Sequence, residues 1–160
     1  MSIYIESKIY NLDNIQEKIR FWKENDKKIV FTNGCFDILH LGHITYLSKA
    51  KELGDILIVG VNSDDSPYWK TKGDNRPINN QTARGLILGS LFFVDAILYF
   101  SEETPIELIK SVIPDVLVKG KDYKEEDIVG YDIVMKNGGE IKTIDMVEGY
   151  STTNIIKKMK

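Results

Sequence analysis

The pattern that decides the fold lies in residues 29–43, which read IVFTNGCFDILHLGH. The run from Ile29 to Phe31 is short and apolar, which predicts a strand that is buried on both faces. Asn33-Gly34 ends this strand, and the apolar spacing that follows predicts a helix over 43–53. A buried strand that passes directly into a helix is the repeating unit of α/β proteins, so this stretch indicates that class.

The rest of the chain repeats this alternation. The further strands that we expect are 56–61, 96–100, 116–118 and 140–144. The further helices that we expect are 13–22, 82–93, one from 104 onward, one that ends near 137, and one from about 151. Capping patterns at Asp13 to Gln16 and at Thr104 to Glu107 place two of the helix starts. The alternation predicts an α/β fold with a doubly wound, five-stranded parallel sheet of the Rossmann-like kind.

The composition suits one domain over residues 1–160, in which 1–26 form an N-terminal helical extension that packs on the rest. The 24 acidic and 21 basic residues give a net charge of −3, which predicts no nucleic-acid partner. The single cysteine excludes an internal disulfide framework. No apolar run approaches the ~18 residues that span a bilayer, and no secretory signal is visible. We therefore expect a cytoplasmic protein without a membrane partner.

The chain has only two histidines, His40 and His43, and both lie where the first strand gives way to its helix. The first turn of a helix offers unpaired N–H groups and the positive end of the helix dipole, which together suit a phosphate. Because doubly wound sheets bind ligands at the carboxyl ends of their strands, the two imidazoles bracket an expected phosphate site. In the alternative interpretation, His40 caps the turn and His43 is a half-buried structural residue.

Residues 34–43 contain an H-x-G-H pattern, and five further motifs follow in order. They are VNSD at 61–64, KTKG at 70–73, RPIN at 76–79, VKGKDY at 118–123 and GYSTTNIIKK at 149–158. The whole set resembles the nucleotidyltransferase superfamily of cytidylyl- and adenylyltransferases. Within that superfamily, the motifs are most similar to the branch that acts on D-glycero-β-D-manno-heptose 1-phosphate. The resemblance covers the chain from about Ile15 to its end.

The resemblance implies adenylyl transfer from ATP to that sugar 1-phosphate, which yields ADP-heptose and pyrophosphate. A phosphate monoester is already largely ionised at neutral pH, so its attack on the α-phosphorus needs no general base and no covalent intermediate. Mg²⁺ is expected to enter with the nucleotide, and no metal site built by the protein is expected. The family's usual behaviour and the apolar stripe of the first helix imply a homodimer. The kinase domain that is often fused in this branch is not seen, which implies a separate sugar kinase.

The resemblance also assigns roles to individual residues. The four expected to be catalytic are His40, His43, Lys72 and Arg84. Those expected to bind the nucleotide are Thr32, Asn33, Gly34, Cys35, Phe36, Gly42, Lys119, Gly149, Tyr150, Ser151, Thr152 and Thr153. Those expected to lie near the acceptor are Asp37, Asn62, Asp64, Gly120 and Asp122.

Structural alternatives remain open for several of these residues. A solvated side chain is the alternative for Lys72, a capping carboxylate for Asp37, and a helix N-cap for Ser151. For Cys35 and Phe36, packing is the favoured interpretation. Asp64 lies next to a second aspartate and is equally typical of a solvated surface.

The longest expected loop, 62–81, is of the kind that often closes over a ligand. Its Tyr68 and Trp69 either stack on a base or hold the loop in place. Residues 66–72 depart from the smaller and more basic sequence of the heptose branch, which leaves the acceptor open. Two other functions therefore remain: a cytidylyltransferase that acts on glycerol 3-phosphate or another polyol phosphate, and a nucleotide-binding module without catalysis.

Overall fold

The computed structural model describes residues 3–73, 75–121 and 124–159. Its helices are α1 (Ile3–Glu6), α2 (Leu12–Glu24), α3 (Leu41–Lys51), α4 (Gln81–Gly89), α5 (Ile106–Val112), α6 (Tyr131–Lys136) and α7 (Thr152–Met159). Its strands are β1 (Ile9–Tyr10), β2 (Ile29–Gly34), β3 (Ile56–Asn62), β4 (Ala96–Phe100), β5 (Val116–Gly120) and β6 (Glu140–Ile144). Two short 3-10 helices are η1 (Pro67–Thr71) and η2 (Glu125–Asp127). Within these described ranges, no helix is both long and apolar enough to cross a membrane.

The strands form one sheet in the order β1-β4-β3-β2-β5-β6, and every neighbouring pair is parallel. The predicted doubly wound parallel sheet is therefore confirmed, but the predicted number of five strands is wrong, because the described chain has six. The additional strand is β1, which pairs Ile9 with Ile97 and Tyr10 with Leu98. A strand of two residues is too short to carry the alternation by which a sequence reveals strands.

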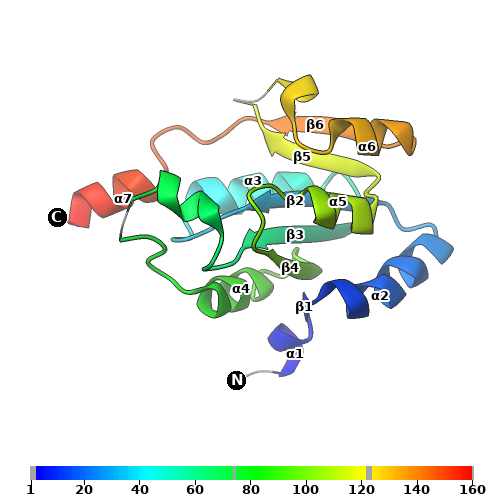
Figure 1. Ribbon diagram of the computed structural model, residues 1–160, viewed down its shortest axis with the longest axis horizontal. Helices are drawn as coiled ribbons and strands as arrows, with labels where there is room; N and C mark the ends of the chain where they lie inside the picture. Colours follow the sequence, from blue (N-terminus) through cyan, green and yellow to red (C-terminus); the bar gives the residue numbers. More distant parts are fainter. Residues whose placement is uncertain (1–2, 74, 122–123, 160) are drawn as a thin grey trace.

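Helices cover both faces of this sheet, as Figure 1 shows. α2, α5 and α6 pack on one face, where Ile15, Phe31 and Ile109 belong to one continuous core cluster. α3 and α4 pack on the other face, where Val30 and Leu47 belong to a second cluster. Val30 and Phe31 are adjacent and serve opposite faces, as the two-residue period of a strand requires. Because both faces are buried, the central strands are apolar throughout, and this makes them conspicuous in the sequence.

β2 lies in the middle of the sheet, at the point where the chain changes direction. From β2 the chain passes through α3 and builds outward to β3 and then β4. From β4 it returns through α5, on the opposite face, to β5 on the other side of β2. The connections that leave β2 and β5 therefore diverge, and such a switch point is where doubly wound sheets bind ligands.

Both capping patterns predicted from the sequence are wrong in detail. The cap of α2 is Asn11, whose side chain accepts hydrogen bonds from the backbone N–H groups of Asp13 and Asn14 at 3.0 and 2.9 Å. Asn14 completes the box by accepting from the backbone N–H of Asn11 at 2.8 Å. Two asparagine amides thus take the place of the expected Asp13 and Gln16. No side chain caps α5, so Thr104 does not have its predicted capping role.

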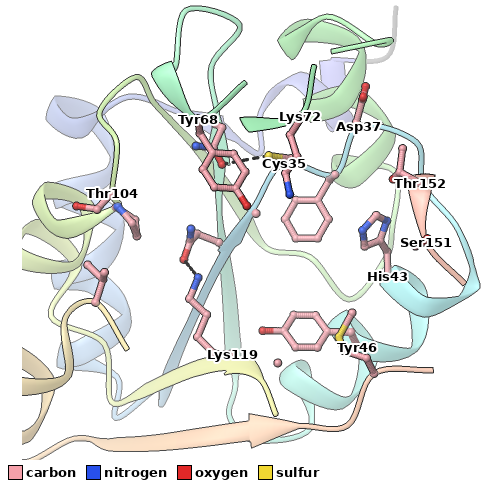
Figure 2. A pocket seen from close by; sticks show the side chains of 18 of the residues that line it. Cys35, Asp37, His43, Tyr46, Tyr68, Lys72, Thr104, Lys119, Ser151 and Thr152 are labelled. Atoms are coloured by element: carbon pink, nitrogen blue, oxygen red, sulfur yellow. Dashed lines mark hydrogen bonds between the residues drawn. The ribbon is translucent and has the colours of Figure 1, made fainter. Parts of the chain in front are cut away.

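The connection between β3 and α4 is held to the body of the protein by Trp69. This residue is buried, and its indole N–H donates to the carbonyl of Ser63 at 2.8 Å. Of the two interpretations of the aromatic pair, Trp69 therefore has the loop-holding role. The neighbouring Tyr68 is half-buried and faces the cavity described below (Figure 2).

α7 lies apart from the two helical layers, and Figure 1 shows it beyond the carboxyl ends of the strands. None of its described residues is buried. Its first turn nevertheless reaches the connection between β2 and α3, because the hydroxyl of Thr152 donates to the carbonyl of Ile38 at 3.4 Å. The last helix is therefore positioned to form one wall of a site at the end of β2.

Candidate active site

A cavity of about 520 Å³ opens at the carboxyl ends of β2, β4 and β5. It lies at the switch point where β2 and β5 part, which is where the fold predicts a ligand. Figure 2 shows His43 and Ser151 on one side of this cavity, Thr104 on the opposite side, and Lys119 between them. Its size falls within the ~300–1,000 Å³ that is usual for small-molecule sites.

His40 and His43 lie side by side at the start of α3, and both line the cavity. His40 is the N-cap of the helix, and its Nδ1 accepts a hydrogen bond from the backbone N–H of His43 at 3.4 Å. The two rings stack, with centroids 3.7 Å apart and planes inclined by 19°. Because Nδ1 of His40 is an acceptor, Nε2 carries the proton and can donate to a ligand. His40 therefore caps the helix and faces the cavity at the same time.

Both imidazoles are uncharged at neutral pH. Burial, with a smaller contribution from the neighbouring His40, lowers the pKa of His43 to about 4, and the backbone of Ile38 opposes this shift. Burial also lowers the pKa of His40. Nδ1 of His43 is buried and has no hydrogen-bond partner in the described part of the chain. An anion bound beside these stacked rings would favour their protonated forms.

Phe36 and two glycines shape the wall around the histidines. Phe36 is buried and meets His43 edge-on, with 5.1 Å between the ring centroids. A Cβ on Gly34 would lie 3.0 Å from the Phe36 ring, and a Cβ on Gly42 would lie 3.1 Å from the His40 ring. Each glycine thus allows a ring to approach the backbone. Phe36 itself has a left-handed φ of 49°, a conformation that costs on the order of 1–3 kcal/mol.

Asn33 and Lys119 connect the two strands that part at the switch point. The ammonium of Lys119, in β5, donates to Oδ1 of Asn33, in β2. Both side chains line the cavity, so a positively charged group lies at its centre (Figure 2). Thr32 lies behind them, fully buried, with its hydroxyl 2.8 Å from the hydroxyl of Tyr46. Thr32 therefore supports the cavity wall from inside the protein.

The start of α7 forms the wall next to the histidines. The hydroxyl of Ser151 accepts a hydrogen bond from the backbone N–H of Asn154 at 3.1 Å, so Ser151 has the N-capping role that the sequence left open. Thr152 is tied to Ile38, in the connection that precedes α3, by the 3.4 Å hydrogen bond given above. Ser151 and Thr152 both line the cavity, and a helix start at this position suits an anion.

Asp37 anchors residues 76–79 to the connection between β2 and α3. Its side chain is fully buried, and its carboxylate accepts from Nε of Arg76 and from the backbone N–H groups of Ile78 and Asn79, the latter two at 2.8 and 2.9 Å. The amide of Asn79 in turn donates to the carbonyl of Asp37 at 2.6 Å. In Figure 2 the carboxylate is directed away from His43. Asp37 is therefore a positioning group in this structure.

Arg84 is buried and uses each of its donor nitrogens within the protein. Nε donates to the carbonyl of Asn79 at 3.0 Å. One terminal nitrogen donates to the carbonyl of Cys35 at 2.8 Å, and the other donates to the carboxylate of Asp64 at 2.7 Å. Arg84 does not line the cavity. It ties the connection after β2 to the segment 62–80, and Asp64 adds a hydrogen bond from the backbone N–H of Gln81 at 2.9 Å.

Lys72 and Tyr68 form the outer wall of the cavity, with Nζ of Lys72 4.9 Å from the centre of the Tyr68 ring. Lys72 is exposed, so its ammonium can reach either solvent or a bound anion.

Cys35 also lines the cavity, and burial raises the pKa of its thiol to about 11 against the opposing charges of Lys72, Arg84 and Arg76. The thiol is therefore protonated at neutral pH and is a poor nucleophile.

The cavity brings most of the predicted residues together. Those that line it are Asn33, Gly34, Cys35, Phe36, Asp37, His40, His43, Asn62, Lys72, Lys119, Gly120, Tyr150, Ser151, Thr152 and Thr153. Those that lie outside its lining are Thr32, Gly42, Asp64, Arg84 and Gly149. The prediction for Asp122 falls outside the described residues.

Sequence reasoning gave no ligand-binding role to several residues that line the cavity, among them Arg76, Glu103, Thr104, Asp127 and Met146. Arg76 belongs to the RPIN motif, which contributes to the family resemblance but does not by itself indicate a role for the arginine. Glu103 and Thr104 lie in the connection that leaves β4, and the carboxyl end of that strand is one of the positions at which the fold predicts a ligand. The signal for these residues was their place after a strand, rather than their type.

The described residues offer no metal cage at this site. The described residues contain no group of three or more His, Cys, Asp or Glu side chains that could hold a metal ion. The buried carboxylate of Asp37 is already engaged by Arg76 and two backbone N–H groups. The residues present therefore do not form a magnesium site of their own.

The fold and the cavity define a class: a doubly wound α/β protein with an anion-binding type of pocket at its switch point. Residues 31–158 match the family model described as Cytidylyltransferase-like. The chain therefore belongs to the cytidylyltransferase-like family. The match begins in β2 and ends in α7, so it includes the strands and helices around the cavity. The resemblance to the nucleotidyltransferase superfamily is thereby confirmed.

Curated relatives share half or more of the aligned residues. The chain is 50% identical over 162 residues to the bifunctional protein HldE of Campylobacter jejuni subsp. jejuni serotype O:6, with 97% of this chain and 34% of that protein covered. It is 60% identical over 134 residues to the bifunctional protein HldE of Nitratiruptor sp., with 84% and 28% covered. The chain thus spans about a third of the length of the curated relatives that it matches.

Two solved structures resemble the chain. The lipopolysaccharide core biosynthesis protein from Thermoplasma volcanium is 31% identical, with a TM-score of 0.62 and with 78% of this chain and 99% of that chain covered. The pantoate-β-alanine ligase from Francisella tularensis is 19% identical, with a TM-score of 0.58 and with 92% and 75% covered. At the latter identity, the likeness concerns the fold alone.

Proposed function

We propose that the chain transfers an adenylyl group from ATP to D-glycero-β-D-manno-heptose 1-phosphate, forming ADP-heptose and releasing pyrophosphate. The observation that carries this proposal is the stacked pair His40 and His43, which lines a cavity at the switch point together with Lys119 and Ser151. A triphosphate in this cavity would meet imidazoles, an ammonium group and a helix start. The six motifs and the similarity to proteins named HldE support the choice of the heptose branch.

In the proposed reaction, an oxygen of the acceptor phosphate forms a bond to the α-phosphorus of ATP. The bond between that phosphorus and the α,β-bridging oxygen breaks, and its electrons leave with pyrophosphate. The attacking oxygen is already ionised, so the site has no proton to remove and needs no nucleophile of its own. The protonated thiol of Cys35 is consistent with such a site. Catalysis then depends on positioning and on stabilising negative charge.

His43 and His40 are proposed to stabilise the charge that develops on the phosphate oxygens. In the free protein both imidazoles are neutral, since burial lowers the pKa of each. The arrival of a triphosphate raises the pKa of a neighbouring imidazole, because the anion favours the charged form. The stacked rings therefore become better donors when the substrate is present. Removing one such donor typically lowers turnover by ~10²–10³-fold.

ATP is proposed to bind as its Mg²⁺ complex. The ion is proposed to be part of the substrate, held by phosphate oxygens and water, because Mg²⁺ usually keeps several waters and binds through substrate phosphates. Ser151, Thr152 and Thr153 are proposed to hold the distal phosphates, and the backbone at Gly149 and Tyr150 to contact the base. The acceptor is proposed to lie near Asn62 and Gly120, which both line the cavity.

A phosphorylating reaction must supply this acceptor, and we propose that a sugar kinase provides it, separate from the domain described. The curated relatives are described as bifunctional, and the stretch they share with this chain is about a third of their length.

We also propose a cytoplasmic homodimer. The apolar stripe of α2 offers no support for the dimer, because Ile15 and Ile19 are buried in the core. Sedimentation of the purified chain would test the oligomeric state.

Pyrophosphate release tests the proposed function. The unaltered chain would be assayed with ATP, CTP, GTP and UTP against D-glycero-β-D-manno-heptose 1-phosphate, its α-anomer and glycerol 3-phosphate, with Mg²⁺. Release that requires both ATP and the β-anomer is the expected result. Release with CTP and glycerol 3-phosphate would contradict it and favour the cytidylyltransferase alternative. Binding of nucleotide without release in any combination would favour the non-catalytic module.

A further inference from the structure

We propose that Arg76 binds a phosphate group in the cavity through the two terminal nitrogens of its guanidinium. This inference deepens the proposed function, since it names a phosphate-binding residue of the same site. Neither the sequence motifs nor the comparisons give Arg76 a role. The proposal rests on which hydrogen-bond donors of this residue are already used and which are not.

Only one part of the Arg76 guanidinium is engaged within the protein. Its Nε donates to the carboxylate of Asp37. Its two terminal nitrogens have no hydrogen-bond partner among the described residues. The only unpartnered polar side-chain atoms that are buried in the described part of the chain are His43 Nδ1 and Ser63 Oγ, so the terminal nitrogens of Arg76 are accessible. The Arg76 side chain retains 11% of its accessible surface and lines the cavity. The unused donors therefore reach the space that a ligand would occupy.

Asp37 fixes the direction of this guanidinium. Its carboxylate is fully buried and is itself held by the backbone N–H groups of Ile78 and Asn79. A charge-assisted bond from a fixed carboxylate to Nε restricts rotation of the planar group. The cost in side-chain entropy of ordering an arginine is thus met by the fold before any ligand arrives. The remaining edge presents a fork of N–H groups that matches two oxygens of one phosphate.

The other arginine near the site lacks this capacity. Arg84 donates from Nε and from both terminal nitrogens to protein oxygens, and its side chain has no exposed surface. Lys72 adds to the positive charge on the side of Arg76, since the charges of both residues oppose the raised pKa of Cys35. The anionic ligand would therefore meet Arg76 and Lys72 on one side and the histidines on the other.

Two phosphates could occupy this position: one in the triphosphate of the nucleotide, or the monoester of the acceptor. Both present the same chemistry to a guanidinium, namely paired anionic oxygens in a plane. They are distinguished by probes that contain only one of them. ATP reports the nucleotide phosphates, and inorganic phosphate reports a site for a phosphate monoester.

The test compares three variants by calorimetry with ATP and with inorganic phosphate. Arg76→Gln removes the charge but leaves Asp37 as an unpaired buried carboxylate, which can destabilise the fold. The double variant Asp37→Asn, Arg76→Gln replaces this pair by two neutral amides. If the single variant does not fold, the affinities for both probes can still be measured with the double variant. Arg20→Gln, an exposed arginine of α2, is the matched control.

We expect the double variant to keep a cooperative unfolding transition and to bind at least one probe roughly tenfold more weakly or worse. Weaker ATP binding assigns Arg76 to the nucleotide, and weaker binding of phosphate alone assigns it to the acceptor. Arg20→Gln should leave both affinities as they are. Unchanged affinity for both probes in the folded double variant would overturn the inference, and so would binding of neither probe by the unaltered chain.

This test and the test of the proposed function can fail independently. If Arg76 proves necessary for phosphate binding but no sugar phosphate accepts a nucleotidyl group, the proposed function is removed and the phosphate site remains. If the double variant turns over ATP and the heptose phosphate with unchanged kcat and unchanged KM values, the role of Arg76 is removed and the proposed function remains.

Discussion

Two walls of the cavity use their polar side chains in different ways. In the wall built by residues 33–43, Nε2 of His40 is left to donate, and the His43 ring lines the cavity beside it. In the segment 62–84, Lys72 and Arg76 line the second wall, whereas Arg84 and Asp64 lie behind it and bind protein groups. The histidine wall retains hydrogen-bond capacity for a ligand, whereas the buried groups behind the second wall use theirs to hold the segment 62–84 in place. A polar residue near a site is a ligand contact only if some of its capacity is unused.

The largest effect that distinguishes the two walls is expected at His43. Replacing it by alanine (His43→Ala) removes an imidazole that lines the cavity, so we expect turnover to fall by ~10²–10³-fold. The measurement is the rate of pyrophosphate release at saturating substrates. The circular dichroism spectrum should stay as in the unaltered chain. Turnover within about twofold of the unaltered rate would remove His43 from the reaction.

Arg84→Gln is expected to act mainly on stability. It leaves the Asp64 carboxylate and two carbonyls with missing donors, and we expect the free energy of unfolding to fall by about 2–3 kcal/mol. Urea unfolding measures this change, with Arg20→Gln as the matched control. If Arg84→Gln unfolds like the control but loses ATP binding, Arg84 is a direct phosphate ligand and the contrast between the walls is wrong.

The histidine wall also makes stability depend on pH. Burial holds the pKa of His43 at about 4, below its ordinary value of 6.5, so between these pH values the unfolded chain binds more protons than the folded one. The free energy of unfolding contributed by His43 should therefore fall as the pH decreases from 6.5 to 4, by up to about 3 kcal/mol.

Urea unfolding of the unaltered chain and of His43→Ala, at a series of pH values, isolates this contribution. The variant should lose less stability over the acidic range, because it lacks the group that gains a proton on unfolding. Parallel pH profiles for the two chains would show that His43 titrates normally in the folded protein.

The smallest effect is expected at Trp69, which is buried behind the second wall. Trp69→Phe keeps an aromatic ring but removes the hydrogen bond to the carbonyl of Ser63, so stability should fall by about 1 kcal/mol. Trp22→Phe, at the only other tryptophan, is the matched control, because Trp22 packs against the core without such a bond. A larger effect on the KM for either substrate than on stability would give Trp69 a ligand-binding role.

The parallel sheet could be predicted from the sequence because strands covered on both faces carry uninterrupted apolar runs, such as residues 56–61 of β3. It was insufficient for β1, where only Ile9 and Tyr10 pair with a neighbour and no period can be seen. The cap of α2 was misplaced because Asn11 and Asp13 both suit an N-cap, and only the backbone conformation chooses between them.

The same limit applies to the site. His40 and His43 could be predicted, because their position follows from one strand and the helix directly after it. The roles of Arg84 and Arg76 could not, because they depend on contacts with residues more than 35 positions away, namely Cys35 and Asp37. Both arginines are polar residues of the same type in one segment, and only the fold determines which of them is surrounded by acceptors.

The central claim is that an oxygen of the acceptor phosphate attacks the α-phosphorus of ATP in this cavity. The most direct test uses D-glycero-β-D-manno-heptose 1-phosphate whose three non-bridging phosphate oxygens are ¹⁸O, with unlabelled ATP and Mg²⁺. Mass spectrometry of the products should find all three labelled oxygens in the nucleotide sugar and none in pyrophosphate. Formation of ADP with a labelled sugar diphosphate, or of AMP with a labelled sugar triphosphate, would contradict the claim, because these products place the attack at the γ- or the β-phosphorus.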